Sequence, residues 1–136
     1  RRNMEFSTLM TKSDLAAARS VEPLVLAELH RFGYSDEAIF AIRLALEEAL
    51  ANAINHGNGR DAAKNVRVDY CVTPQKAVIR VSDEGPGFCR DCVPDPTASE
   101  NLEKPSGRGI MLMEAYMNEV RWNKAGNQVI MVKNNE

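Results

Sequence analysis

Two pairs of strand-like segments, each joined by only a few residues, most strongly limit the folds open to this 136-residue chain. In the first pair, apolar and polar residues alternate from Val66 to Val72, and a β-rich run from Ala77 to Ser82 follows the turn Thr73-Pro74-Gln75. The second pair comprises Val120 to Asn123 and Gln128 to Lys133. Because parallel neighbours need a crossover of about a dozen residues or more, both pairs are predicted to be antiparallel hairpins.

A further strand and a long helix are predicted before these hairpins. Met4 to Leu9 alternates as a short strand does. A helix is expected from Ser13, a suitable N-cap, to Phe32, with Gly33 ending it. Pro23 lies inside this segment. Because proline removes a helical hydrogen bond and clashes with the preceding turn, we expect a kink or a break there.

The second predicted helix has two different faces. Ser35 is suited to cap its N-terminus, and Gly57 follows its end. One face carries the apolar residues expected to pack on a sheet: Ile39, Ile42, Leu46, Ala49, Leu50 and Ala53. The opposite face carries polar groups with small residues beside them: Glu48, Asn52, Asn55, Ala41 and Ala45. We therefore expect a polar helix face with room next to it.

A third helix is predicted where apolar periodicity resumes at Ile110, Met113 and Met117. Five strands and three helices, with strands mostly joined as hairpins, predict an α+β two-layer sandwich. In this architecture the helices cover one face of a mixed, mostly antiparallel five-stranded sheet. A doubly wound fold fits poorly, because the middle and final strand pairs have no crossover helix. Residues 1–136 are expected to form a single domain, since the chain is too short for two.

Composition and charge exclude several classes of protein. A net charge of −2 gives no excess of basic groups for a phosphate backbone, so no direct nucleic-acid partner is expected. No apolar run approaches the roughly 18 residues that span a bilayer, and no export signal is recognisable, so we expect a cytoplasmic protein without a membrane partner. The odd count of three cysteines fits a reducing compartment. Cys89 and Cys92 lack the two further ligands that a zinc site needs.

Three short motifs occur in order along the predicted elements. Residues 48–57 (EALANAINHG) lie on the second helix, residues 83–87 (DEGPG) follow a strand, and residues 106–110 (SGRGI) open the third helix. Each motif alone is common in unrelated proteins. Their order and their placement on a polar helix face, at a strand end and before a helix indicate one site.

The motif on the second helix suits a metal-bound phosphate. Glu48 and Asn52 are four residues apart, so their side chains are neighbours and can address one ligand. The carboxamide oxygen of Asn52 is a neutral, hard ligand suited to Mg²⁺, which takes further oxygens from water and phosphates. Glu48 would orient a hydroxyl or water and accept its proton. Asn55 is a candidate for lining the phosphate end, with a role as a helix cap or surface group as the alternative.

The strand-end motif suits an adenine base. The carboxylate of Asp83 accepts hydrogen bonds only, which fits the exocyclic amino group of adenine. Gly85 and Gly87 lack a Cβ, so the backbone there can approach a flat base and turn sharply into the following loop. The sequence therefore predicts the base-binding end of a nucleotide site at this strand end.

The glycine pair before the third helix suits an anion. Gly107 and Gly109 lie where free backbone N–H groups and the positive end of the helix dipole can bind phosphates. Arg108 between them adds a cation. Together with the other two motifs, this arrangement predicts ATP and Mg²⁺ as the ligands of the site.

These motifs resemble the Asn box and the two glycine boxes of the GHKL (Bergerat-fold) ATPases. The compact chain is similar to the anti-sigma factor serine kinases among them. The resemblance implies that Glu48 acts as catalytic base, that Asn52 binds Mg²⁺ and that Asp83 contacts adenine. It implies that Gly107 and Gly109 line the phosphates. It also implies a cytosolic protein-serine kinase that binds a sigma factor and phosphorylates an anti-sigma factor antagonist, with a homodimer formed through the first strand and helix.

Two features depart from the family pattern. Relatives often carry a threonine after the glycine of the last hairpin, where this chain has Gly126-Asn127-Gln128, and the Cys89/Cys92 pair has no assigned role. A non-catalytic ATP-sensing interaction module is therefore kept as the alternative function. The catalytic half of a histidine kinase is disfavoured, because no helical hairpin presents a phosphoacceptor histidine. The loop from Phe88 to Ser106 is short enough to leave space for a protein substrate.

Overall fold

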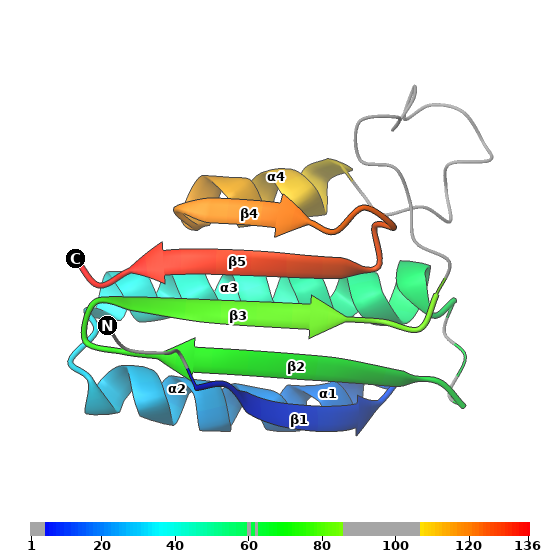
Figure 1. Cartoon of the computed structure of the whole chain (residues 1–136), viewed down its shortest axis with the longest axis horizontal. Coiled ribbons are helices and arrows are strands. Elements are labelled where there is room, and N and C mark those ends of the chain that lie inside the picture. The colour runs from blue at the N-terminus through cyan, green and yellow to red at the C-terminus, as the bar shows by residue number, and fades with distance from the viewer. Residues whose placement is uncertain (1–4, 60, 62, 86–106) are drawn as a thin grey trace.

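A five-stranded sheet forms one layer of the molecule, and the helices cover one of its faces (Figure 1). The computed structural model describes residues 5–59, 61, 63–85 and 107–136. The strands lie in the order β1-β2-β3-β5-β4, and each neighbouring pair is antiparallel. The predicted two-layer α+β sandwich is confirmed. The described strands contain no parallel pair, so the expected mixed sheet is purely antiparallel in this part of the chain.

Both predicted hairpins are present. The first joins β2 (Asn65–Val72) to β3 (Lys76–Ser82), and the second joins β4 (Glu119–Trp122) to β5 (Gln128–Asn134). The first strand, β1 (Ser7–Lys12), begins and ends three residues later than the predicted run from Met4 to Leu9. Its pairing with β2, which extends to Lys12 opposite Asn65, sets this boundary and is invisible to local alternation.

The first predicted helix is broken into parts. It consists of α1 (Leu15–Ala18), a 3₁₀ turn (Arg19–Val21) and α2 (Glu22–Arg31). The expected break is confirmed, since Pro23 lies in the first turn of α2, where its missing N–H costs nothing. The predicted cap at Ser13 is wrong: Asp14 caps α1 through a hydrogen bond from the Ala16 amide, 3.2 Å long. The hydroxyl of Ser13 instead accepts a bond from Asn58 at 3.1 Å.

The second predicted helix is confirmed as α3 (Asp36–Asn52). Its cap is Ser35, whose Oγ accepts from the Ala38 amide at 3.0 Å. The last turn widens into a π-helical segment, Ala53–Gly57, of the kind that often marks a functional site. The third predicted helix is α4 (Gly107–Tyr116). Figure 1 shows α3 behind the centre of the sheet and α4 behind β4.

The core lies between the sheet and the helices. Val66 and Val68 of β2, Leu46 and Leu50 of α3 and Met113 of α4 are all at most 2% exposed. Each such side chain contributes on the order of 1.5–3 kcal/mol through burial. This packing holds the C-terminal end of α3 against the ends of β3 and α4. No helix in the described part of the chain is long and apolar enough to cross a bilayer.

Candidate functional site

Two of the predicted motifs meet where α4 begins beside the last turns of α3. Gly109 lies so close that a Cβ built on it would be 2.8 Å from Oε1 of Glu48 and 3.9 Å from Oδ1 of Asn52. Any side chain at this position would therefore press on the polar face of α3. The absence of a Cβ lets the backbone of α4 approach Glu48 and Asn52 at Gly109.

The small residues of α3 have a different role from the one expected. Ala41 and Ala45 were predicted to leave room beside the polar face, but they are 5% and 1% exposed, because α4 packs on them. The expectation of room fails at Ala45 but holds at Ala41, which lines an open pocket together with Ala38, Ala115 and Tyr116. Short side chains let α4 approach closely, and this places its N-terminus over the next two turns, at Glu48 and Asn52.

Asn52 is an unusual buried amide. The residue is 9% exposed, and its Nδ2 atom has no hydrogen-bond partner among the described residues. Leaving a buried polar group unpaired costs about 1–3 kcal/mol. Glu48 is half buried on the preceding turn, and its carboxylate likewise has no hydrogen-bond or ion-pair partner within the described ranges. The site thus presents a carboxylate and an amide nitrogen that no group in the described part of the chain binds.

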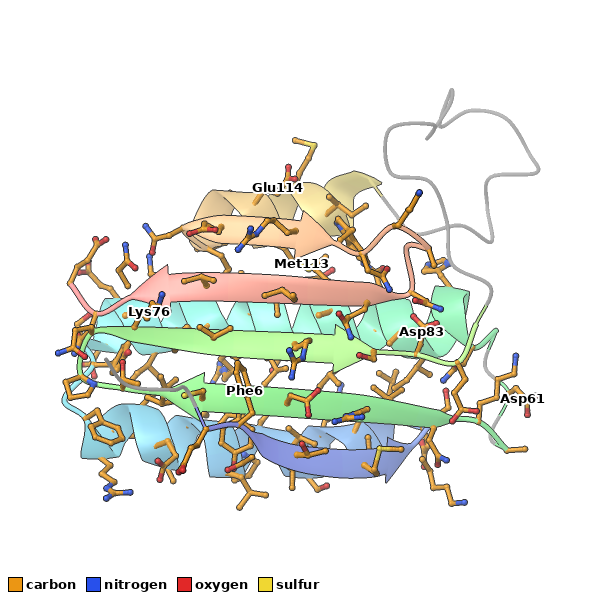
Figure 2. The ribbon with its side chains drawn as sticks, in the orientation of Figure 1. Phe6, Asp61, Lys76, Asp83, Met113 and Glu114 are labelled. Atoms are coloured by element: carbon orange, nitrogen blue, oxygen red, sulfur yellow. The ribbon has the colours of Figure 1, made fainter. Side chains whose placement is uncertain are left out.

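The strand-end motif packs against the π-helical end of α3. A Cβ on Gly57 would collide with the carboxylate of Asp83, and a Cβ on Gly85 would overlap the carbonyl oxygen of Gly57. Figure 2 labels Asp83 at the C-terminal end of β3. Both glycines are therefore required for the end of α3 and the end of β3 to touch. This contact brings the second predicted motif beside the first.

The Asp83 carboxylate is held in a tight turn. The Gly85 amide donates to its Oδ1 at 2.8 Å. Burial raises the pKa of Asp83 above its ordinary value, while the Gly85 hydrogen bond and the charge of Lys64 act in the opposite direction. The carboxyl group is thus partly desolvated, and such a group gains from a donor on a ligand.

Asn127 joins this turn to the last hairpin, which the sequence did not reveal. Its carbonyl oxygen accepts from the Asp83 amide at 3.0 Å, and its Nδ2 donates to the Gly85 carbonyl oxygen at 3.1 Å. Gly126, at a φ of 82°, turns the chain so that Asn127 reaches both. This is the position at which the chain departs from its family pattern. Asn127 buttresses the strand-end motif through backbone and side chain together.

Asn58 was also missed. It is 2% exposed, its Nδ2 donates to the Ser13 hydroxyl and the Asn65 carbonyl, and its Oδ1 accepts from the Glu84 amide at 2.7 Å. It therefore fixes the chain after α3 against β3. An asparagine just past a helix end is the only local signal, and that signal does not distinguish this role from an ordinary turn.

The remaining predicted positions are less completely described. Gly87, Cys89 and Cys92 lie outside the described residues, as does the loop from Phe88 to Ser106. Gly107 and Arg108 form the first turn of α4, but the arginine side chain is outside the description. Asn55 is half buried in the π-helical turn, and its side chain has no hydrogen-bond partner among the described residues.

The geometry defines what the site can bind. At one end, a partly buried carboxylate at Asp83 can accept a hydrogen bond beside glycine backbone. At the other end, the N-terminus of the ten-residue α4 places its positive dipole next to Asn52 and Glu48. A ligand with a hydrogen-bond donor at one end and an anionic group at the other fits this pair. The unpaired Nδ2 of Asn52 is a donor that fits a phosphate oxygen, and the Oδ1 of the same side chain is the atom that could face a cation.

Comparisons with known proteins matched most of the chain to one family and found similar proteins. Residues 11–133 match a family described as the histidine kinase-like ATPase domain. The chain is 33% identical over 110 residues to the serine-protein kinase RsbW of Bacillus subtilis, covering 76% of this chain and 69% of that protein. It is 27% identical over 109 residues to the serine-protein kinase RsbW of Oceanobacillus iheyensis, with the same two shares covered.

A solved structure supports the fold. The crystal structure of the RsbU and RsbW domains of a Mycobacterium tuberculosis protein aligns with a TM-score of 0.63 at 19% identity. The alignment covers 100% of this chain and 33% of that longer chain.

Proposed function

Because this chain belongs to the histidine kinase-like ATPase domain family, we propose that it is an ATP-dependent protein-serine kinase that acts as an anti-sigma factor. The observation that carries the proposal is the convergence of Glu48, Asn52 and the N-terminus of α4 at the end of α3. The names of its relatives support the serine-kinase activity. A sigma factor and an anti-sigma factor antagonist are the proposed partners.

Different residues of the chain bind the adenine and the phosphates of ATP. Asp83 accepts a hydrogen bond from the exocyclic amino group of adenine, and burial strengthens this bond by excluding water. Gly85 lets the backbone approach the base, as Gly87 does in the following loop. The amides of Gly107 and Gly109 at the start of α4 bind the phosphates. Asn127 holds the adenine end in place through Asp83 and Gly85.

Glu48 provides the catalytic group for phosphate transfer. Its unpaired carboxylate lies one turn before Asn52, beside the amides of α4. It orients the serine hydroxyl of the antagonist protein and accepts its proton as the serine oxygen bonds to the terminal phosphorus of ATP. The bond from that phosphorus to the bridging oxygen breaks, and ADP leaves. Asn52 holds Mg²⁺ through its carboxamide oxygen, with Asn55 lining the same end. When bound, this cation offsets the negative charge of the phosphates.

The test compares neighbouring glutamates in the same helix. Phosphate transfer from labelled ATP to a candidate antagonist protein is measured for the parent, Glu48→Gln and Glu47→Gln, since Glu47 is exposed and lies outside the site. We expect Glu48→Gln to slow transfer on the order of 10²–10⁴-fold, the usual contribution of a general base. Glu47→Gln is expected to transfer at the parental rate. Equal rates for the parent and Glu48→Gln would show that the base is misassigned.

Calorimetry separates the kinase from a non-catalytic sensor of the same fold. We expect adenine nucleotide to bind in a magnesium-dependent manner to the parent and to Glu48→Gln alike. Magnesium-dependent binding without transfer to any antagonist protein tested would favour the ATP-sensing module. If neither ATP nor ADP binds with magnesium present, the nucleotide site itself is wrong.

A further inference from the structure

The face of the sheet opposite the helices concentrates positive charge. Among the described residues, no helix covers this face (Figure 1). Because strand residues alternate and Val68, Ile79 and Met131 point into the core, the residues next to them in sequence point to the open side. The strand cations on this side are Lys12, Arg67, Lys76, Arg80 and Arg121, against the carboxylates Asp69 and Glu119. The whole chain nevertheless has a net charge of −2.

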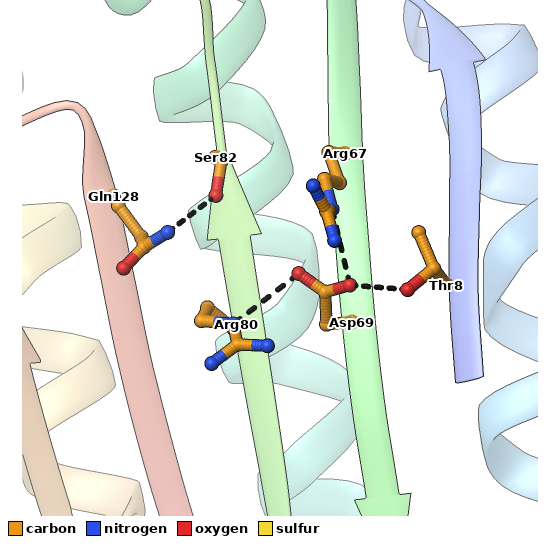
Figure 3. Close-up of polar contacts among 6 residues, drawn as sticks. All are labelled: Thr8, Arg67, Asp69, Arg80, Ser82 and Gln128. Atoms are coloured by element: carbon orange, nitrogen blue, oxygen red, sulfur yellow. Dashed lines mark hydrogen bonds and ion pairs between the residues drawn. The ribbon is translucent and has the colours of Figure 1, made fainter. Parts of the chain in front are cut away.

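A buried carboxylate organises the centre of this face (Figure 3). Asp69 is 2% exposed and accepts three hydrogen bonds: from the Thr8 hydroxyl at 2.5 Å, from Nε of Arg67 at 3.1 Å and from Nε of Arg80 at 3.2 Å. Although burial acts to raise it, these bonds keep the pKa of Asp69 below its ordinary value. Asp69 therefore stays ionised and holds both arginines in place.

The two arginines present unused donors to solvent. Both bind Asp69 through Nε, and their terminal nitrogens have no hydrogen-bond or ion-pair partner within the described part of the chain. The side chains of Arg67 and Arg80 are 53% and 31% exposed. The guanidinium of Arg80 also lies 4.6 Å from the centre of the Phe6 ring, which restricts its plane. Each guanidinium is thus a preoriented fork of the kind that binds a carboxylate.

Apolar side chains lie among these cations. Met10 of β1 is 61% exposed, and Ile130 of β5 stands opposite both Arg80 and Arg121 in the strand register. A nucleic-acid backbone would use the arginines but gain little from the apolar groups, whereas a protein segment would use both. A second copy of this chain is disfavoured, because the strand cations on this face outnumber the carboxylates by five to two and two such faces would repel each other.

We propose that the open face of the sheet binds an acidic segment of a partner protein, with carboxylates on Arg67 and Arg80 and an apolar side chain against Met10. This interaction is separate from the nucleotide site, which lies on the helix side of the sheet. It therefore does not depend on the proposed kinase activity.

The test uses the full chain without nucleotide and a fluorescein-labelled peptide of alternating glutamate and leucine. Binding is followed by fluorescence anisotropy, with glutamine replacing each glutamate in a control peptide. We expect Arg67→Gln and Arg80→Gln each to weaken binding by roughly 10-fold or more, as expected for loss of a charge-assisted bond. Met10→Ser is expected to weaken binding by a smaller factor.

Arg43→Gln is the matched control, since Arg43 is 52% exposed and ion-paired on α3, away from this face. It is expected to bind the acidic peptide as the parent does. If Arg43→Gln and Arg80→Gln weaken peptide binding equally, the binding depends only on net charge and the proposal is overturned. So would equal binding of the glutamine peptide, or tighter binding of an oligothymidine of the same charge whose affinity is unaffected by Met10→Ser. Circular dichroism of each variant confirms that the fold is retained.

Discussion

The helix side and the open side of the sheet each bury a polar side chain, and they treat it in opposite ways. Asn52, on the helix side, is 9% exposed and leaves its amide nitrogen without a partner among the described residues. Asp69, on the open side, is 2% exposed and has three donors. An unpaired buried polar group opposes folding, and the proposed nucleotide site gives a reason for it at Asn52. Asp69 is fully paired within the protein. The unused donors on this side are the terminal nitrogens of Arg67 and Arg80.

The largest expected effect on stability lies where the end of β3 touches the end of α3. Gly85→Ala places a Cβ against the carbonyl oxygen of Gly57, a backbone atom that cannot move without shifting the end of α3. We expect the free energy of unfolding to fall by about 3 kcal/mol, the upper end of what overpacking costs. Urea denaturation measures it. Gly59→Asn is the control, because this site has open space around it and asparagine tolerates its φ of 60°.

Asp69→Asn tests the buried, fully paired carboxylate on the open side of the sheet. The substitution removes the charge that holds Arg67 and Arg80, and we expect the free energy of unfolding to fall by about 2 kcal/mol. Glu119→Gln is the matched control, because this carboxylate pairs with Arg121 at 3.4 Å with both side chains more than half exposed. Its loss should be within about 0.5 kcal/mol of zero. If the two variants lose the same free energy of unfolding, Asp69 does not hold Arg67 and Arg80 in place.

Asn52→Leu should change the free energy of unfolding in the opposite direction to Asp69→Asn. Replacing an unpaired amide by an apolar group of similar size is expected to leave the free energy of unfolding unchanged or to raise it by up to about 1 kcal/mol, while magnesium-dependent nucleotide affinity is lost. Asn58→Leu provides the contrast, because the Asn58 amide bonds Ser13, Asn65 and Glu84. That variant should be destabilised. A clear loss of stability in Asn52→Leu would mean that its amide has a structural partner.

The smallest effects concern pH, and two carboxyl groups should differ in sign. The pKa of Asp69 is lowered by folding, so its stabilising contribution is present above the ordinary value of about 4 and is lost as pH falls below it. The pKa of Asp83 is raised, so this group reduces stability as pH rises above about 4. Unfolding measured from pH 3 to 7 should show the deficit of Asp69→Asn shrinking on acidification. At neutral pH the Asp83→Asn variant should be more stable to unfolding, relative to the parent, than it is at acid pH.

Local signals in the sequence predicted much of this protein. Ser35 as a helix cap, the break near Pro23 and the two hairpins were all confirmed, because each depends on residues a few positions apart. Local signals failed where a distant residue intervened. Ser13 is not the cap, because Asn58, 45 positions away, binds its hydroxyl. The room expected beside Ala45 is filled by α4.

The candidate site was predicted as a set of residues but not as a geometry. The order of motifs made Glu48, Asn52, Asp83 and the glycines candidates, because each residue type carries its chemistry wherever it is placed. The support from Asn127 was missed, since its bonds to Asp83 and Gly85 span more than 40 positions.

The sequence by itself determined the helices, the strands and the chemical groups available, because backbone propensity and side-chain chemistry are local properties. Only the tertiary structure decided where charge collects. The net charge of −2 gave no sign of a cationic surface, yet antiparallel pairing and strand alternation direct Arg67, Arg80 and Arg121 to one face. Likewise, only packing reveals that the amide of Asn52 is buried and unpaired. The cationic face and the buried Asn52 amide both depend on which surfaces exclude water. The packing of the helices on the sheet decides this.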